Sequence, residues 1–160
     1  GPIRKSELLL YTTLVHIGNQ EYKTAKKYIS NAIIDHNIKY LPLMRTIRLV
    51  RLIVFYEVQE HELIQYESRS ITRSLSSPKE QTFKTERIIL WFLNKRNIPI
   101  LKKDREAFWE KLSPEIHELY NNKYESQLLR LFDFTAWMES KIRKEKLSEV
   151  LRARASAKEC

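Results

Sequence analysis

Apolar residues recur every three or four positions along most of the chain, which is the pattern of amphipathic helices. The clearest example lies at about 21–37, whose apolar face consists of Tyr22, Ala25, Ile29, Ala32 and Ile33. No segment alternates convincingly between apolar and polar residues, so the pattern predicts no strand. Abundant Leu, Ile, Lys, Arg and Glu agree with an all-α fold.

Start and stop signals divide this pattern into about seven helices. A serine, a proline and a glutamate at 77–80 match a capping box that opens the fifth helix. Ser113-Pro114-Glu115 predicts a sharp kink or a restart in the sixth helix. The seventh helix meets no breaker and is expected to be long. The predicted helices span about 6–18, 21–37, 43–59, 60–76, 77–96, 102–121 and 123–160.

The second helix carries an aromatic–alanine–bulky–alanine spacing, formed by Tyr22, Ala25, Ile29 and Ala32. The small residues let two antiparallel helices approach, and the larger ones wedge into the next hairpin. This segment resembles the second helix of a tetratricopeptide-type repeat, with the first helix as its partner. The resemblance implies a right-handed superhelix of stacked antiparallel hairpins, whose first helices line a concave groove.

Hairpins at about 41–77 and 79–121 would form two further units of this stack. They depart from the repeat pattern, because Tyr66 and Ser70 stand where an alanine and a bulky residue are usual. The spacing between units, about 40 residues, also exceeds the 34 of the standard repeat.

We expect Gly1-Pro2 to be a tag remnant, 3–142 to be the repeat domain and 143–160 to be a basic C-terminal helix or tail. The missing initiator methionine suggests a segment of a longer polypeptide. With one cysteine, Cys160, and no apolar run long enough to span a membrane, the sequence predicts a cytoplasmic protein without disulfides.

Lysine and arginine number 29 and acidic residues 20, so the formal net charge is 29 − 20 = +9. This charge favours acidic partners, namely nucleic acid, an acidic peptide or an anionic membrane surface. A charge of this size also serves solubility alone. Two glycines are too few for phosphate-cradling loops or dinucleotide-binding fingerprints.

The candidate catalytic chemistry is sparse. None of the histidines, His16, His36, His61 and His117, has a second histidine or a cysteine three or four residues away. A helical zinc pair therefore does not form. We expect no enzyme, no cofactor and no metal site.

The strongest functional signal is a basic and aromatic stripe on the third and fifth helices. Arg45 and Arg48 lie on the side of the third helix away from Ile47 and Val54. On the fifth helix the stripe consists of Lys84, Arg87, Trp91 and Lys95. Such cations suit a carboxylate or phosphate, with a side chain or base stacked on Trp91. An ordinary solvated surface, with Trp91 buried between hairpins, is the competing interpretation.

The tail from Lys141 is basic and only weakly amphipathic, with an apolar stripe of Leu147, Val150 and Leu151. It is interpreted either as a frayed terminus or as a helix that contacts nucleic acid, a membrane surface or a second copy. The second interpretation predicts a homodimer that truncation after Ile142 would convert to a monomer.

The sequence therefore favours a non-catalytic protein-interaction module that binds an acidic peptide or protein segment in a basic, aromatic-lined groove. The alternative is a nucleic-acid-binding or transcription-regulatory helical domain that uses the same surface. A steep loss of binding with salt would favour that alternative.

Overall fold

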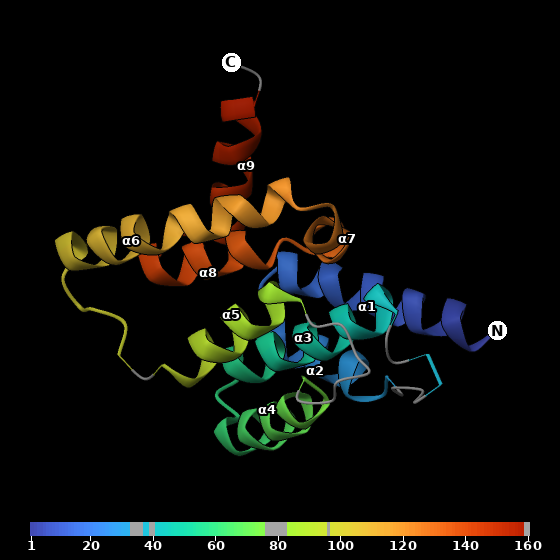
Figure 1. Cartoon of the computed structure of the whole chain (residues 1–160). Helices are drawn as coiled ribbons and strands as arrows, with labels where there is room; N and C mark the ends of the chain where they lie inside the picture. Colours follow the sequence, from blue (N-terminus) through green and yellow to red (C-terminus); the bar gives the residue numbers. More distant parts are fainter. Residues whose placement is uncertain (33–36, 39–40, 76–82, 96, 159–160) are drawn as a thin grey trace. The chain divides into compact units, whose positions relative to one another are not determined.

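The structure is a computed structural model, and it describes residues 1–32, 37–38, 41–75, 83–95 and 97–158 (Figure 1). Every regular element within these ranges is an α-helix, which confirms the all-α prediction. The chain divides into two units, Gly1–Glu86 and Arg87–Cys160. The capping box predicted at 77–80 lies outside the described residues.

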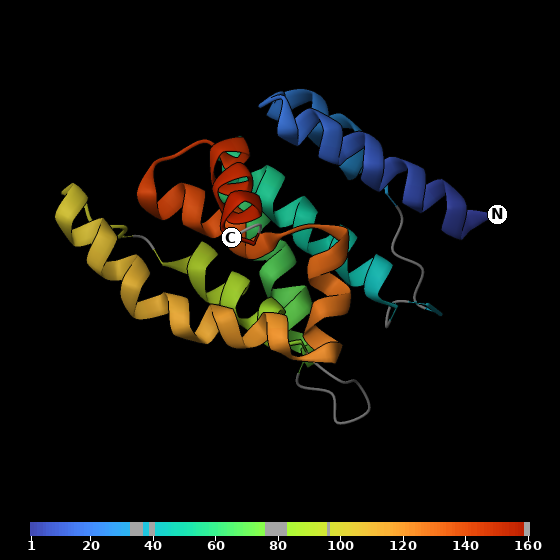
Figure 2. The same cartoon turned by 90° about the horizontal axis from the view of Figure 1, so that it is seen from above.

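The first unit is a run of sequential helix pairs. Helix α1 packs on α2, α2 on α3 and α3 on α4, and α1 also touches α3. Figures 1 and 2 both show α1 and α2 side by side. The helices are α1 (Pro2–Gly18), α2 (Tyr22–Ser30), α3 (Pro42–Glu57) and α4 (His61–Leu75), and α5 (Lys84–Asn94) begins at the end of this unit.

Two turns of the first unit share one backbone geometry. Gln20, between α1 and α2, and Gln59, between α3 and α4, have φ values of 59° and 62°. In each turn the following N–H bonds a carbonyl five residues back, Glu21 to His16 at 2.8 Å and Glu60 to Phe55 at 2.9 Å. This is the Schellman-type end of a helix. The turns lie 59 − 20 = 39 residues apart, so α1 and α3 end in the same way.

Helix α3 is the core of the first unit. Of its 16 residues, ten are buried, and they lie on all sides of the helix. A helix that is covered all round belongs to an interior. The solvent-facing basic side predicted for this helix is therefore wrong, with consequences for Arg45 and Arg48.

The second unit is built around α8. Helix α6 contacts both α7 and α8, and α8 contacts α9. Trp137 of α8 is 1% exposed, and its ring meets the Phe92 ring edge-on, with centroids 5.6 Å apart. The helices that follow α5 are α6 (Lys102–Asn121), α7 (Lys123–Leu131), α8 (Phe134–Arg143) and α9 (Leu147–Lys158).

The single long helix predicted after Lys123 is wrong, because three helices occupy that stretch. The Asn122 side chain accepts hydrogen bonds from the Tyr124 and Glu125 N–H groups at the start of α7. Asp133 caps α8 in the same way, accepting from Ala136 N–H at 3.1 Å. At the other end of α8, Lys144 has a φ of 55°, which ends the helix. The described residues thus form nine helices, where the sequence pattern predicted seven.

Helix α6 continues through Pro114 and does not restart there. A proline lacks the N–H that would bond the carbonyl four residues earlier, which is the Glu110 carbonyl. The Ser113 hydroxyl donates to that carbonyl instead, at 3.2 Å. This hydrogen bond reduces the free-energy cost of the proline inside the helix, and α6 continues past Pro114.

Candidate interaction site

The structure places Arg45 inside the first unit, where it is 4% exposed. Its guanidinium forms an ion pair with the buried carboxylate of Glu86 and lies 5.6 Å from the centroid of the Phe83 ring. The same carboxylate accepts the Phe83 N–H at 3.1 Å, at the start of α5. Arg45 was predicted to contact a partner, and its burial corrects that prediction.

The other arginines of α3 also bond within the unit. Arg48 is half-buried, and its Nη1 lies 3.5 Å from the Ser74 hydroxyl of α4. Arg51 donates to the Ala32 carbonyl and lies 3.5 Å from Glu67 Oε1. The arginines of α3 therefore bond to neighbouring elements of the first unit. The candidate binding surface is consequently limited to the cations of α5 and Lys95.

Helix α5 presents the predicted stripe on its exposed side. Lys84, Arg87 and Trp91 are exposed, and Trp91 keeps 46% of its surface in contact with solvent. The other side of the helix is buried and consists of Ile88, Ile89, Leu90, Phe92 and Leu93. The assignment of these two faces from the sequence agrees with the burial. Lys84 belongs to the first unit, and Arg87, Trp91 and Lys95 belong to the second.

Lys95, half-buried just after α5, ends in an aromatic setting. Its ammonium lies 4.9 Å from the ring centroid of Trp91 and 4.2 Å from that of Phe108 on α6. The two rings are nearly parallel, with centroids 6.3 Å apart. Both distances fall within the about 6 Å reach of a cation–π interaction. The Trp91 and Phe108 rings therefore hold the Lys95 ammonium in place at the surface.

A hollow of about 290 Å³ opens beside this pair, lined by Arg87, Ile88, Trp91, Leu112 and Glu115. Ile88 and Leu112 are buried and give it an apolar floor, whereas Arg87 and Glu115 are exposed at its edge. The hollow combines an apolar base with one cation on the α5 side and one carboxylate on the α6 side. Such a lining suits part of an amphipathic segment.

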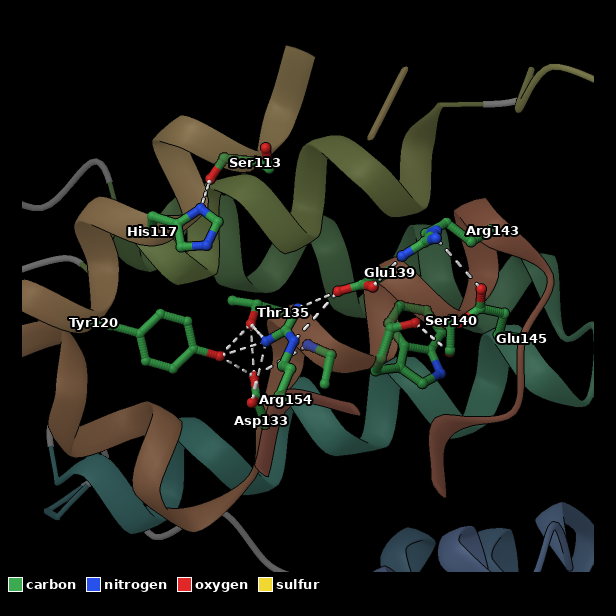
Figure 3. A network of polar contacts seen from close by, with 12 residues as sticks. Ser113, His117, Tyr120, Asp133, Thr135, Glu139, Ser140, Arg143, Glu145 and Arg154 are labelled. Atoms are coloured by element: carbon green, nitrogen blue, oxygen red, sulfur yellow. Dashed lines mark hydrogen bonds and ion pairs between the residues drawn. The ribbon is translucent and has the colours of Figure 1, made fainter. Parts of the chain in front are cut away.

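A second cluster in this unit, centred on Arg154, was missed by the sequence-based prediction (Figure 3). Arg154 Nη1 donates to the Tyr120 hydroxyl at 2.8 Å and to the Thr135 hydroxyl at 2.7 Å. Its Nη2 donates to Glu139 Oε1 at 2.8 Å. The Tyr120 hydroxyl in turn donates to Asp133 Oδ1 at 2.6 Å. One arginine of α9 thus joins α6 and α8.

The Arg154 cluster fits an internal anchor better than a ligand site. Most of the five N–H donors of the Arg154 guanidinium already have an acceptor within the chain. Burial and the hydrogen bond to Asp133 raise the pKa of the Tyr120 phenol well above its ordinary value, so the phenol stays neutral. Arg143 extends the cluster to Glu139 at 3.0 Å. Arg154 shares a helix face with Val150, and this spacing was the sequence signal that could have found it.

The predicted contact stripe of α9 is largely used within the chain. Val150 is 1% exposed, Leu147 is half-buried, and Leu151 is exposed. Helix α9 therefore packs on α8. Val150 is consequently not available to a second copy, which corrects that part of the prediction.

Another hollow, of about 580 Å³, lies at the turns of the first unit and is lined by Gln20, Glu21, Tyr22, Lys23, Thr24, Glu57, Val58 and Gln59. Burial and the Glu57 charge raise the pKa of Tyr22 to about 12. Two carboxylates and one lysine give this lining mixed charge, and no single ligand chemistry stands out.

Two of the described histidines, His16 and His117, bond locally. His16 Nδ1 lies 3.1 Å from the Glu21 carboxylate, and His117 donates to the Ser113 carbonyl at 2.7 Å (Figure 3). In the part of the chain that the structure describes, no three His, Cys, Asp or Glu side chains gather as metal ligands. Over the same residues, no helix has the length and apolarity needed to cross a membrane.

Comparisons with protein-family models, with curated proteins and with solved structures gave no match.

Proposed function

We propose that this chain is a non-catalytic protein-interaction module that binds an acidic peptide or protein segment at the α5–α6 surface. The observation that carries the proposal is the Lys95 ammonium held over the Trp91 and Phe108 rings, next to a helix side that also exposes Arg87. A cation held in place in this way loses little side-chain entropy when a carboxylate binds. The aromatic rings add apolar contact area next to the charge.

The helical hairpins support a tetratricopeptide-like stack as the scaffold. Sequential contacts from α1 to α4, with an added contact between α1 and α3, are what stacked hairpins make. The matching left-handed turns at Gln20 and Gln59 give two hairpins of equal design. The third predicted hairpin would pair α5 with α6, and one ring contact, between Trp91 and Phe108, supports it. We propose that this last hairpin presents the binding surface.

The composition of the hollow favours a peptide over nucleic acid. Glu115 lines it together with Arg87, and a carboxylate there repels the phosphates of a polynucleotide backbone. A peptide offers N–H groups to Glu115 as well as carboxylates to Arg87. Binding to nucleic acid, the alternative, would require the phosphates to avoid Glu115.

Charge reversal on α5 tests the proposal against a matched control. The test variant is Arg87→Glu/Lys95→Glu, and the control is Arg4→Glu/Lys5→Glu on α1, where both residues are exposed. Each variant lowers the formal charge by four, to 9 − 4 = +5. The probes are fluorescein-labelled polyglutamate and a single-stranded oligonucleotide of equal charge, followed by fluorescence anisotropy.

We expect the α5 variant to weaken polyglutamate binding about tenfold or more and the α1 variant to change it less than about twofold. Equal losses in the two variants would show that net charge alone drives binding and would overturn the proposal. Tighter binding of the oligonucleotide, with the steeper salt dependence of counterion release, would support the nucleic-acid alternative instead.

A further inference from the structure

The hollow lined by α5 and α6 is a small site with an apolar floor. Its volume, about 290 Å³, lies just below the about 300–1,000 Å³ typical of small-molecule sites. Ile88 and Leu112 form its buried floor, and the half-exposed Trp91 forms one wall. Protein interfaces concentrate their binding energy where a large apolar side chain fills a pocket and excludes water from it.

Two cations stand on either side of the Trp91 wall. Arg87 lies one helical turn before Trp91, and Lys95 lies one turn after it. At a rise of about 1.5 Å per residue, the backbones of Arg87 on α5 and of Lys95 just after it are about 12 Å apart, and the Lys95 ammonium extends back to 4.9 Å from the Trp91 ring centroid. In an extended peptide, residues four apart span about 13 Å, and residues two apart share one face.

We infer that this hollow receives one large apolar side chain of an extended acidic segment, with carboxylates two residues before and two residues after that anchor. The anchor packs on Ile88, Trp91 and Leu112, and the two carboxylates face Arg87 and Lys95. Glu115, on the α6 side, accepts a backbone N–H of the segment. This inference rests on the proposed function and specifies the chemistry of its partner.

The test uses two short peptides of equal charge, each fluorescein-labelled and measured by anisotropy with the full chain. The first contains Glu-Ser-Phe-Ser-Glu, and the second contains Glu-Ser-Ala-Ser-Glu. We expect the phenylalanine peptide to bind about tenfold tighter or better, because only it fills the hollow. The comparison needs no variant of the protein, so it does not depend on how a variant folds.

Two substitutions locate the effect. Trp91→Ala removes the wall of the hollow, and we expect it to abolish most of the preference for phenylalanine. Tyr66→Ala removes an exposed aromatic residue on α4 and serves as the control, with the preference unchanged.

The failure of the inference differs from the failure of the proposed function. If both peptides bind alike while Arg87→Glu/Lys95→Glu still abolishes binding, the anchor pocket is refuted and the basic surface stands. If neither peptide binds, or if charge reversal on α5 has no effect, both proposals are overturned.

Discussion

At the residue scale, the buried pair of Arg45 and Glu86 makes the first unit sensitive to the loss of either charge. Both side chains are nearly inaccessible to solvent, and Glu86 also accepts the Phe83 N–H. Removing one charge from such a pair leaves the other desolvated without compensation, which is costly. The pair also ties α3 to the start of α5.

We expect Arg45→Ala to lower the free energy of unfolding by about 3–5 kcal/mol. The double variant Arg45→Met/Glu86→Gln should recover much of this loss, because it removes both charges and keeps an acceptor for Phe83. Urea unfolding of the variants, followed by circular dichroism, measures both values. A loss below about 1 kcal/mol in the single variant would contradict the buried pair.

Tyr22 gives the first unit a dependence on alkaline pH. Its pKa rises from the model-peptide value of 10.0 to about 12, first through burial and then through the Glu57 charge. The folded chain holds this proton more tightly than the unfolded chain. The resulting stability is therefore complete below pH 10 and is lost as the pH rises through about 12.

We expect the unfolding free energy to fall more steeply in the unmodified chain than in Tyr22→Phe over this interval. Urea unfolding at about pH 9 and pH 11 compares the two proteins. Equal slopes would mean that Tyr22 does not contribute.

These residues show how far a helical face predicts exposure. On α5 one side is covered, so the apolar pattern located Lys84, Arg87 and Trp91 at the surface correctly. On α3 the same reasoning failed for Arg45, because the helix is covered on all sides. The carboxylate that accommodates the arginine, Glu86, lies 41 residues away. The spacing of apolar residues within one helix gives no information about a partner so far away in the sequence.

At the scale of elements, α1, α3 and α8 are each followed by a left-handed residue that is not glycine. Gln20, Gln59 and Lys144 all have positive φ. A side chain in this region costs about 1 kcal/mol or more relative to glycine, part of which is offset by the greater freedom of unfolded glycine. The turns therefore hold stored strain that a substitution can release.

We expect Gln59→Gly to raise the free energy of unfolding by about 0.5–1 kcal/mol, and Gln59→Ala to leave it unchanged or lower. Thermal or urea unfolding measures the difference between the two variants. If alanine stabilises the chain as much as glycine, the left-handed turn is not present in solution.

The helix boundaries were partly predictable. Gly18-Asn19 and Pro42 marked real ends, whereas the breaks at Asp133 and Lys144 were missed. Asp133 is an N-cap signal in the sequence, but the apolar residues around it suggested a continuous buried helix. The restart predicted as one alternative at Pro114 does not occur, since α6 continues through it and the Ser113 hydroxyl donates to the carbonyl that proline leaves unbonded.

At the scale of the whole molecule, the chain combines two units, each with its own core. From the sequence we predicted helical hairpins and a basic surface formed by both α3 and α5. The structure retains the α5 part and uses the α3 cations internally. The contacts of Trp91 and Lys95 with Phe108 could not be predicted, because only tertiary packing brings residues of α6 to this side of α5.

The three tryptophans provide the most direct test of the proposed site. Trp91 lies on the α5 surface, Trp109 lies 6.0 Å from the Arg154 guanidinium, and Trp137 is buried in α8. Each indole N–H gives its own resonance in a ¹⁵N-labelled protein, and substitution of each tryptophan assigns it. On titration with the Glu-Ser-Phe-Ser-Glu peptide, we predict that the Trp91 resonance shifts while the Trp137 resonance stays in place. Binding of the peptide with an unchanged Trp91 resonance would contradict a site on α5.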